Sequence, residues 1–155
     1  MILTFDIGTT AVKASLFDEK LSLLESATRE YELIAEQALQ VELDAETYWE
    51  GIAHCVKLML ARRPEAASEI KGIGITSQGE TLIPVDTAGK ALRRAIVWLD
   101  GRAVEESETI RSLFDEKTFY TRTGIPDCNG LCPVSKLLWI KRHEPGLYGR
   151  TYKFL

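Results

Sequence analysis

No run of apolar residues in this sequence is long enough to cross a membrane, which takes about 20 consecutive residues in a helix. The amino terminus also lacks the basic start of a signal peptide, and Asp6 interrupts its apolar stretch. Basic residues form no cluster, since Arg62-Arg63 and Arg93-Arg94 are only pairs and the net charge is -4. Nucleic acids are bound by clustered cations. These absences predict a cytoplasmic protein that binds neither membranes nor nucleic acids.

Cysteine and histidine are scarce as well. The three cysteines, Cys55, Cys128 and Cys132, are an odd number without a further His or Cys pair, so we expect free thiols rather than disulfides or a zinc site. The two histidines, His54 and His143, lie in predicted helices and are expected to be structural. No Ser–His–Asp arrangement supports a hydrolase, and no Gly-x-x-x-x-Gly-Lys loop is present.

The sequence does contain a mixture of strand and helix patterns. Its 155 residues suffice for one domain with a core, and 45% of them are apolar. The predicted strands are Ile2–Ile7, Ala11–Phe17, Leu21–Leu33, Ile70–Thr76, Thr81–Val85 and Ala95–Trp98, and the predicted helices are Arg102–Leu113, Asp115–Thr121, Pro133–His143 and one between Asp44 and Pro64. The mixture predicts an α/β or α+β fold, opened by an antiparallel meander of three strands, with helices packed on the sheet.

Three elements carry more detailed predictions. Asp44 is a suitable N-cap for the first helix. The strand Ile70–Thr76 is rich in β-branched residues and is predicted to be buried. The helix Pro133–His143 has proline in its first turn, and its predicted apolar face consists of Val134, Leu137 and Leu138, with the stem of Lys141 as a candidate fourth member.

The strongest local signal for chemistry is Asp6-Ile7-Gly8-Thr9-Thr10, at the turn between the first two strands. A carboxylate at a strand end can bind Mg²⁺ directly or through water. Glycine at the bend lets backbone N–H groups approach an anion, and the threonine hydroxyls add donors. The segment is therefore either a phosphate-binding hairpin or an ordinary tight turn.

Two further segments place polar groups at strand ends, where ligands commonly bind. In the first, Gln78 offers a donor and an acceptor and Glu80 a strong acceptor, both suited to sugar hydroxyls. In the second, Trp98 is a candidate wall for a sugar and Asp100 a candidate hydroxyl acceptor held by Arg102. The alternatives are a polar strand end for the first, and a core tryptophan with a surface ion pair for the second.

The order of these segments resembles that of the FGGY carbohydrate kinases, which include xylulokinase, ribulokinase and glycerol kinase. The matching stretches are spread over nearly the whole chain and are Phe5–Thr10 with Lys13, Ile73–Asp86, Gly89 with Ala95–Ala103, Thr123-Gly124, Ser135–Trp139 and Glu144-Pro145. This ordered set is far more specific than any one of its motifs.

The resemblance implies an actin-like ATPase fold of ribonuclease H type and ATP-dependent transfer of the γ-phosphoryl group to a sugar hydroxyl. It implies ATP and Mg²⁺ as cofactors and a sugar or polyol as partner, and it leaves a homo-oligomer open. It places Asp6 on the metal and phosphate side. The residues that it places around the ATP phosphates are Gly8, Thr9, Thr10 and Lys13, and those in the sugar pocket are Gln78, Glu80, Trp98 and Asp100.

The sequence also departs from the family. Gly79 stands where glycerol kinases have an arginine, and the Met-His-Gly of xylulokinases does not follow Gln78. The substrate specificity of neither group therefore carries over to this sequence. The Trp-x-Asp-x-Arg pattern favours pentoses and related sugars as substrates. Family kinases are much longer, with the general base and the nucleotide domain beyond residue 155. We therefore expect residues 1–155 to be a truncated amino-terminal sugar-binding domain that is inactive alone. The alternative is a non-catalytic actin-like module that binds sugar or nucleotide.

Overall fold

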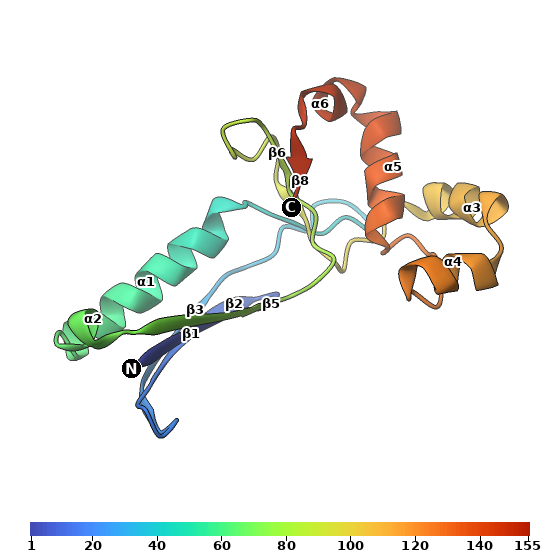
Figure 1. Cartoon of the computed structure of the whole chain (residues 1–155). Helices are drawn as coiled ribbons and strands as arrows, with labels where there is room; N and C mark the ends of the chain where they lie inside the picture. The colour runs from blue at the N-terminus through green and yellow to red at the C-terminus, as the bar shows by residue number, and fades with distance from the viewer. The chain divides into compact units, whose positions relative to one another are not determined.

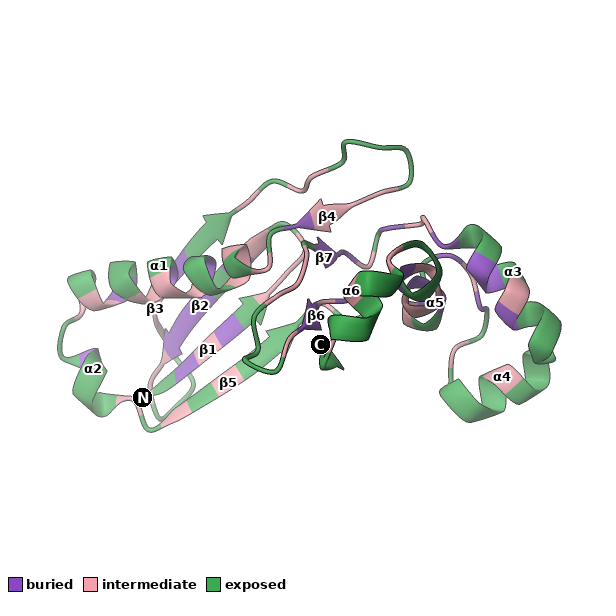
Figure 2. Cartoon of the chain, turned by 90° about the horizontal axis from the view of Figure 1, so that it is seen from above, coloured by how far each residue is buried: buried purple, intermediate pink, exposed green.

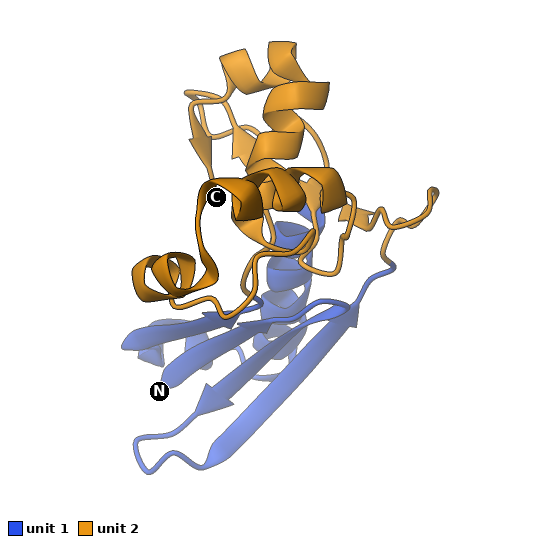
Figure 3. Ribbon diagram, turned by 90° about the vertical axis from the view of Figure 1, so that its right-hand side faces the viewer, with its two compact units in different colours: residues 1–32, 45–78 blue, residues 33–44, 79–155 orange.

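The computed structural model describes all 155 residues, and they form two compact units. Unit 1 contains residues 1–32 and 45–78, and unit 2 contains residues 33–44 and 79–155 (Figure 3). The elements of unit 1, labelled in Figure 1, are β1 (Ile2–Ile7), β2 (Ala11–Phe17), β3 (Leu23–Glu30), α1 (Glu46–Arg62), α2 (Ala66–Glu69) and β5 (Gly72–Ser77). None of the helices in either unit is both long and apolar enough to span a membrane.

Unit 1 is built on a mixed sheet with the strand order β3-β2-β1-β5. The first three strands are antiparallel, as the sequence predicts, and β5 pairs with β1 in parallel. The third strand is shorter than predicted because a turn delays its start. In that turn the Asp18 carboxylate accepts hydrogen bonds from the backbone N–H groups of Lys20 and Ser22, both at 2.8 Å, and Leu21 has a φ of 61°.

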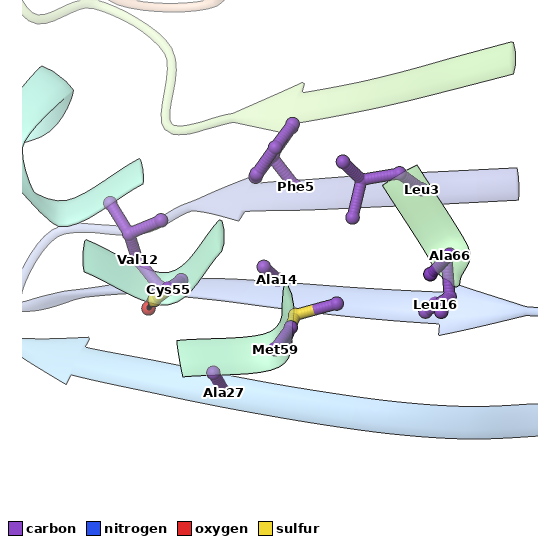
Figure 4. Close-up of a cluster of buried hydrophobic side chains, with 9 residues drawn as sticks. All are labelled: Leu3, Phe5, Val12, Ala14, Leu16, Ala27, Cys55, Met59 and Ala66. Carbon is purple, nitrogen blue, oxygen red and sulfur yellow. Dashed lines mark hydrogen bonds between the residues drawn. The ribbon is translucent and has the colours of Figure 1, made fainter. Parts of the chain in front are cut away.

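The core of unit 1 lies between this sheet and α1, which packs on β2 and β3 (Figure 2). The close-up in Figure 4 shows its buried side chains, which are Leu3, Phe5, Val12, Ala14, Leu16, Ala27, Cys55, Met59 and Ala66. Gly51 of α1 lets the helix approach β2, because a Cβ atom there would lie 3.0 Å from Val12 Cγ2. Each large apolar side chain buried here contributes about 1.5–3 kcal/mol to the free energy of folding. The packed layer therefore holds the β1–β2 hairpin in place.

The helix predicted between Asp44 and Pro64 is confirmed, but its predicted cap is wrong. The N-cap is Ala45, and it makes no side-chain hydrogen bond to the helix. Glu46 in the first turn and Arg62 in the last turn stabilise the helix instead, because their charges interact favourably with the helix dipole. Pro64 then follows the helix end, as the sequence predicts.

The prediction that the strand around residues 70–76 is buried is also wrong. Ile73 and Ile75 of β5 are 64% and 68% exposed, although they lie in register beside the buried Leu3 and Phe5 of β1. The reason is that β5 is an edge strand, and α1 covers β2 and β3 rather than β5 (Figure 2). A β-branched sequence therefore predicts the strand, but not how far the covering layer extends.

Unit 2 consists of short strand pairs and four helices. Its elements are β4 (Glu42–Leu43), β6 (Pro84–Val85), β7 (Ala95–Ile96), α3 (Val104–Leu113), α4 (Glu116–Thr123), α5 (Pro133–His143), α6 (Pro145–Arg150) and β8 (Lys153–Phe154). Strand β4 pairs with β7, and β6 with β8. The predicted strands at 81–85 and 95–98 are thus shortened to two residues each.

Helix α5 has the predicted bounds, and Leu137 of its predicted apolar face packs against the small core of unit 2. Its buried residues are Ser135, Lys136 and Ile140, whereas Val134 is 40% exposed. Ile140 packs with Leu82 and Ile96 in the small core of unit 2. Because α5 also turns a serine and a lysine inward, periodicity in apolar residues identified only part of its inner face.

Candidate functional site

One end of the unit 1 sheet carries a row of polar side chains on the face opposite α1. Asp6 of β1 lies in register with Lys13 of β2 and with Thr76 of β5, and all three are exposed. Thr4 and Ser15 line the same shallow hollow of about 430 Å³. Neither Asp6 nor Lys13 takes part in a side-chain hydrogen bond or ion pair. The carboxylate of Asp6 and the ammonium group of Lys13, from neighbouring strands, are thus both accessible to a ligand here.

The turn from β1 to β2 lies at this same end. The Gly8 N–H donates to the Ala11 carbonyl oxygen at 2.9 Å, and a Cβ atom on Gly8 would lie 3.1 Å from that oxygen, so the turn favours glycine. Tyr31 braces the turn from outside: its hydroxyl donates to the Gly8 carbonyl oxygen and its backbone N–H to that of Thr10. Thr9 is half-buried and Thr10 is exposed. The turn is therefore tight, and Tyr31, the residue that follows β3, holds it through two hydrogen bonds.

Two tyrosines that the sequence analysis missed complete this end of unit 1. The rings of Tyr31 and Tyr48 meet edge to face, with centroids 5.7 Å apart. Burial raises the pKa of Tyr31 to about 12, and the charges of Tyr48 and Asp6 add to the effect. The phenol therefore stays protonated at neutral pH and can donate to Gly8. Tyr31 directly follows β3, and that position at a strand end was the available signal.

Gln78 follows β5 and contacts the second of these tyrosines. Its Nε2 donates to the Tyr48 hydroxyl oxygen at 2.7 Å, and its backbone N–H donates to the Ile7 carbonyl oxygen at 2.9 Å. Its Oε1 atom is buried and has no hydrogen-bond partner. Buried polar atoms are normally paired, so an unpaired amide oxygen is a candidate acceptor for a ligand.

Tyr31→Phe is expected to destabilise the hairpin by about 1 kcal/mol, because it removes one hydrogen bond to a partly buried carbonyl without changing the ring. Urea unfolding and amide hydrogen exchange at Thr9 and Thr10 measure the effect. Tyr120→Phe is the matched control, since Tyr120 is 56% exposed. Equal stability and exchange in both variants would show that Tyr31 does not brace the turn.

A Mg²⁺ ion of the kind expected from the sequence would find only part of its ligand shell in this chain. No three His, Cys, Asp or Glu side chains gather into a metal-binding group. Asp6, however, presents an exposed carboxylate that forms no side-chain hydrogen bond or ion pair. Mg²⁺ usually keeps several waters and is bound through one or two carboxylates plus phosphates. The chemistry of Asp6 fits that arrangement.

In unit 2, the surroundings of Asp100 argue against the predicted role as a sugar acceptor. The side chain is fully buried. Its Oδ1 accepts from the backbone N–H and the Nε of Arg102 at 3.1 and 2.9 Å, and its Oδ2 accepts from the Val41 N–H at 2.6 Å and Arg102 Nη2 at 2.7 Å. Four acceptor positions are thereby filled. Asp100 holds its own segment in place and leaves no lone pair for a ligand.

The predicted pairing of Asp100 with Arg102 is confirmed, but it is a buried network and not a surface pair. Arg102 also donates to Glu42 Oε1 at 2.7 Å, and Arg93 bridges Glu42 and Glu144. Burial opposes the charge on Arg102, yet hydrogen bonds to Asp100 and Glu42 outweigh it and raise its pKa above the ordinary value. The network links β4 to the segment that follows β7.

Glu80 and Trp98 remain as the accessible candidates for the predicted sugar pocket in unit 2. Glu80 is exposed and has a φ of 62°, a left-handed conformation that is uncommon outside glycine. Trp98 is half-buried, and its backbone N–H donates to Thr81 Oγ1 at 3.2 Å. Strained residues cluster at functional sites, so Glu80 stays a candidate. Sequence reasoning missed Lys136, which is fully buried against the Trp98 segment.

Comparison with known proteins decides the family. All residues from 1 to 155 match the model for the amino-terminal domain of the FGGY family of carbohydrate kinases. The chain belongs to this family. It is 33% identical over 156 aligned residues to a glycerol kinase from Brucella ovis, covering 98% of this chain and 30% of that enzyme. The chain thus spans about a third of the length of the FGGY relatives that it matches.

Solved structures of FGGY kinases agree with this assignment. The xylulose kinase from Rhodospirillum rubrum superimposes with a TM-score of 0.92 at 27% identity, over 98% of this chain and 31% of that one. The Plasmodium falciparum glycerol kinase with ADP gives a TM-score of 0.82 at 26% identity, over 96% and 30% of the two chains. The predicted α/β fold of the actin-like ATPases is confirmed by these FGGY neighbours.

Proposed function

We propose that this chain is the amino-terminal sugar-binding domain of an ATP-dependent carbohydrate kinase, which transfers the γ-phosphoryl group of ATP to a hydroxyl of a sugar or polyol. The observation that carries the proposal is the match of the whole chain to the FGGY amino-terminal domain. The nucleotide domain and the general base would belong to a further part of the protein. Residues 1–155 alone are then inactive, because they hold only part of the reaction centre.

On this proposal the polar end of unit 1 is the phosphate side. Gly8, Thr9 and Thr10 would wrap the ATP phosphates with backbone N–H groups and hydroxyls, while Lys13 supplies a positive charge. Asp6, which lies in register with Lys13, would hold Mg²⁺ directly or through water. A bound Mg²⁺ supplies charge neutralisation for the phosphates. Phosphoryl transfer depends mainly on such positioning and charge stabilisation, which these residues can provide.

For the sugar side, the resemblance assigns Gln78 of unit 1 and Glu80 and Trp98 of unit 2, and we propose each of them as a sugar ligand. The unpaired Oε1 of Gln78 and the exposed carboxylate of Glu80 can accept hydrogen bonds from hydroxyl groups. The ring of Trp98 offers an apolar wall. Asp100 and Arg102 act on this side only indirectly, through the backbone that they fix. The relatives are named for glycerol and xylulose, so pentoses, pentuloses and small polyols are the substrates to test first.

The test is a coupled ATP-dependent phosphorylation assay on two proteins, the complete gene product and the 155-residue chain. We expect turnover with at least one pentose, pentulose or polyol in the complete product. The chain alone should show none, since it offers no placed base for the attacking hydroxyl. Sugar-dependent turnover by residues 1–155 would overturn the proposal that the general base and the nucleotide domain belong to a further part of the protein. Sugar binding without turnover by the complete product would favour the alternative, a non-catalytic actin-like module.

A further inference from the structure

Lys136 on α5 is a lysine without solvent contact. Its side chain is fully buried, although lysine is among the residues most seldom buried in proteins. Its Nζ donates to the backbone carbonyl oxygens of Val97 at 3.0 Å and Trp98 at 3.1 Å. Burying an ammonium group is costly unless it is paired and hydrogen-bonded. The Nζ group meets this condition through its two carbonyl acceptors, so Lys136 holds the backbone of Val97 and Trp98.

The groups that face Lys136 come from both sequence motifs proposed for the sugar side. Burial lowers its pKa to about 8, while the negative charges of Asp100 and Glu80 raise it and Cys132 acts in the same direction. The positive charge of Arg102 opposes them. Below pH 8 the ammonium form predominates. One buried cation thus lies within the electrostatic reach of both Glu80 and Asp100.

The backbone of Trp98 is held from two sides. Its carbonyl oxygen accepts from Lys136, and its N–H donates to Thr81 Oγ1 at 3.2 Å. Two residues further on, Asp100 is fixed by Arg102 and by the backbone of Val41. A residue whose N–H and carbonyl are both held by side chains has a fixed main-chain position, which fixes the direction in which its side chain leaves the backbone. Such support is what keeps a binding side chain in a productive position.

We propose that Lys136 is a positioning residue of the sugar side, which fixes the main chain that carries Trp98. The inference rests on the proposed function for the claim that Trp98 contacts a sugar. The contacts of Lys136 with the Trp98 segment do not depend on it. Displacements of about 1 Å at a binding group are enough to change rates by large factors.

The test compares Lys136→Met with Lys141→Met, which makes the same change at an exposed position of the same helix. The first readout is the indole N–H resonance of each tryptophan in the ¹⁵N-labelled 155-residue chain, assigned by Trp→Phe substitution. In Lys136→Met we expect the Trp98 signal to shift or broaden, the Trp139 signal on α5 to move less, and the Trp49 signal on α1 to stay. Equal changes at Trp98 and Trp139 would indicate a general disturbance of α5 and overturn the inference.

The second readout is steady-state kinetics of the complete gene product. Lys136→Met should raise the sugar KM about tenfold and leave the ATP KM within about twofold, approaching the effect of Trp98→Ala. A purely structural role would lower the active fraction, and hence kcat, without changing the sugar KM. Lys136→Arg keeps donors at the site and should recover part of the affinity. If neither variant folds, Lys136 is required for the fold itself and the specific role is wrong.

The two readouts separate the two proposals. If the wild-type product phosphorylates no sugar, the proposed function fails, and the Trp98 resonance in Lys136→Met still decides whether Lys136 positions that segment. If the wild type is active and Lys136→Met has an unchanged sugar KM and an unchanged Trp98 signal, the function stands and the inference about Lys136 fails.

Discussion

Asp6→Ala in the complete gene product is expected to lower kcat by about a hundredfold or more, with the sugar KM changed by less than about threefold. Removing one preorganised group that stabilises charge in a transition state typically costs about 10²–10³ in rate. Asp6 is exposed at the end of β1 and lies in register with Lys13, on the face proposed for the phosphates. On the proposed function Asp6 would act on the metal and phosphates, so loss of its carboxylate should leave sugar binding nearly intact.

The measurement is the same coupled assay, with sugar and ATP varied in turn. Glu30→Ala is the control, because Glu30 is another exposed acid at a strand end of the same sheet. Exposed side chains such as these contribute little to stability, so both variants should unfold at similar urea concentrations. Unchanged turnover in Asp6→Ala would remove Asp6 from the reaction centre. A raised sugar KM with normal kcat would instead place it on the sugar side.

The parts of unit 1 that sequence could predict are those set by local patterns. Alternation and a glycine at the bend fix β1, β2 and their hairpin, because a period of two and a tight turn involve only neighbouring residues. The exposure of Ile73 and Ile75 could not be predicted, since it depends on where α1 lies over the sheet. Similarly, Tyr31 reaches Gly8 across 23 positions, and no spacing rule joins two such residues.

The unit 2 motifs illustrate a different limit. Residue type identified Trp98, Asp100 and Arg102 as a set. The sequence alone, however, does not distinguish an aspartate that accepts four hydrogen bonds from the protein from an aspartate that binds a ligand. The bonds from Arg102 and from Val41, about 60 residues earlier, decide between them. The sequence analysis did not identify the buried Lys136 on α5 for a related reason, because apolar periodicity assigns charged residues to the outside of a helix. Buried charges are where pattern reasoning fails and where function is often located.

Arg102→Met is expected to destabilise unit 2 by about 3–5 kcal/mol, the cost of removing one partner from a buried ion pair. The Arg102 side chain is 4% exposed, and it donates to Asp100 through two nitrogens and to Glu42 through one. Methionine matches most of the stem but leaves Asp100 buried with only backbone donors. Urea unfolding and hydrogen exchange at the Val41 N–H, which bonds Asp100, measure the effect.

A matched control and a second substitution make the cause identifiable. Arg94→Met removes an exposed arginine whose distance to Glu36 is 3.7 Å, and it should cost less than about 1 kcal/mol. In the double variant Arg102→Met with Asp100→Asn, the unpaired buried charge is gone, so part of the lost stability should return. If Asp100→Asn adds its own full cost to that of Arg102→Met, the two side chains are not coupled. Asp100 would then again be available as a ligand for the sugar, and the indirect role given to it here would be wrong.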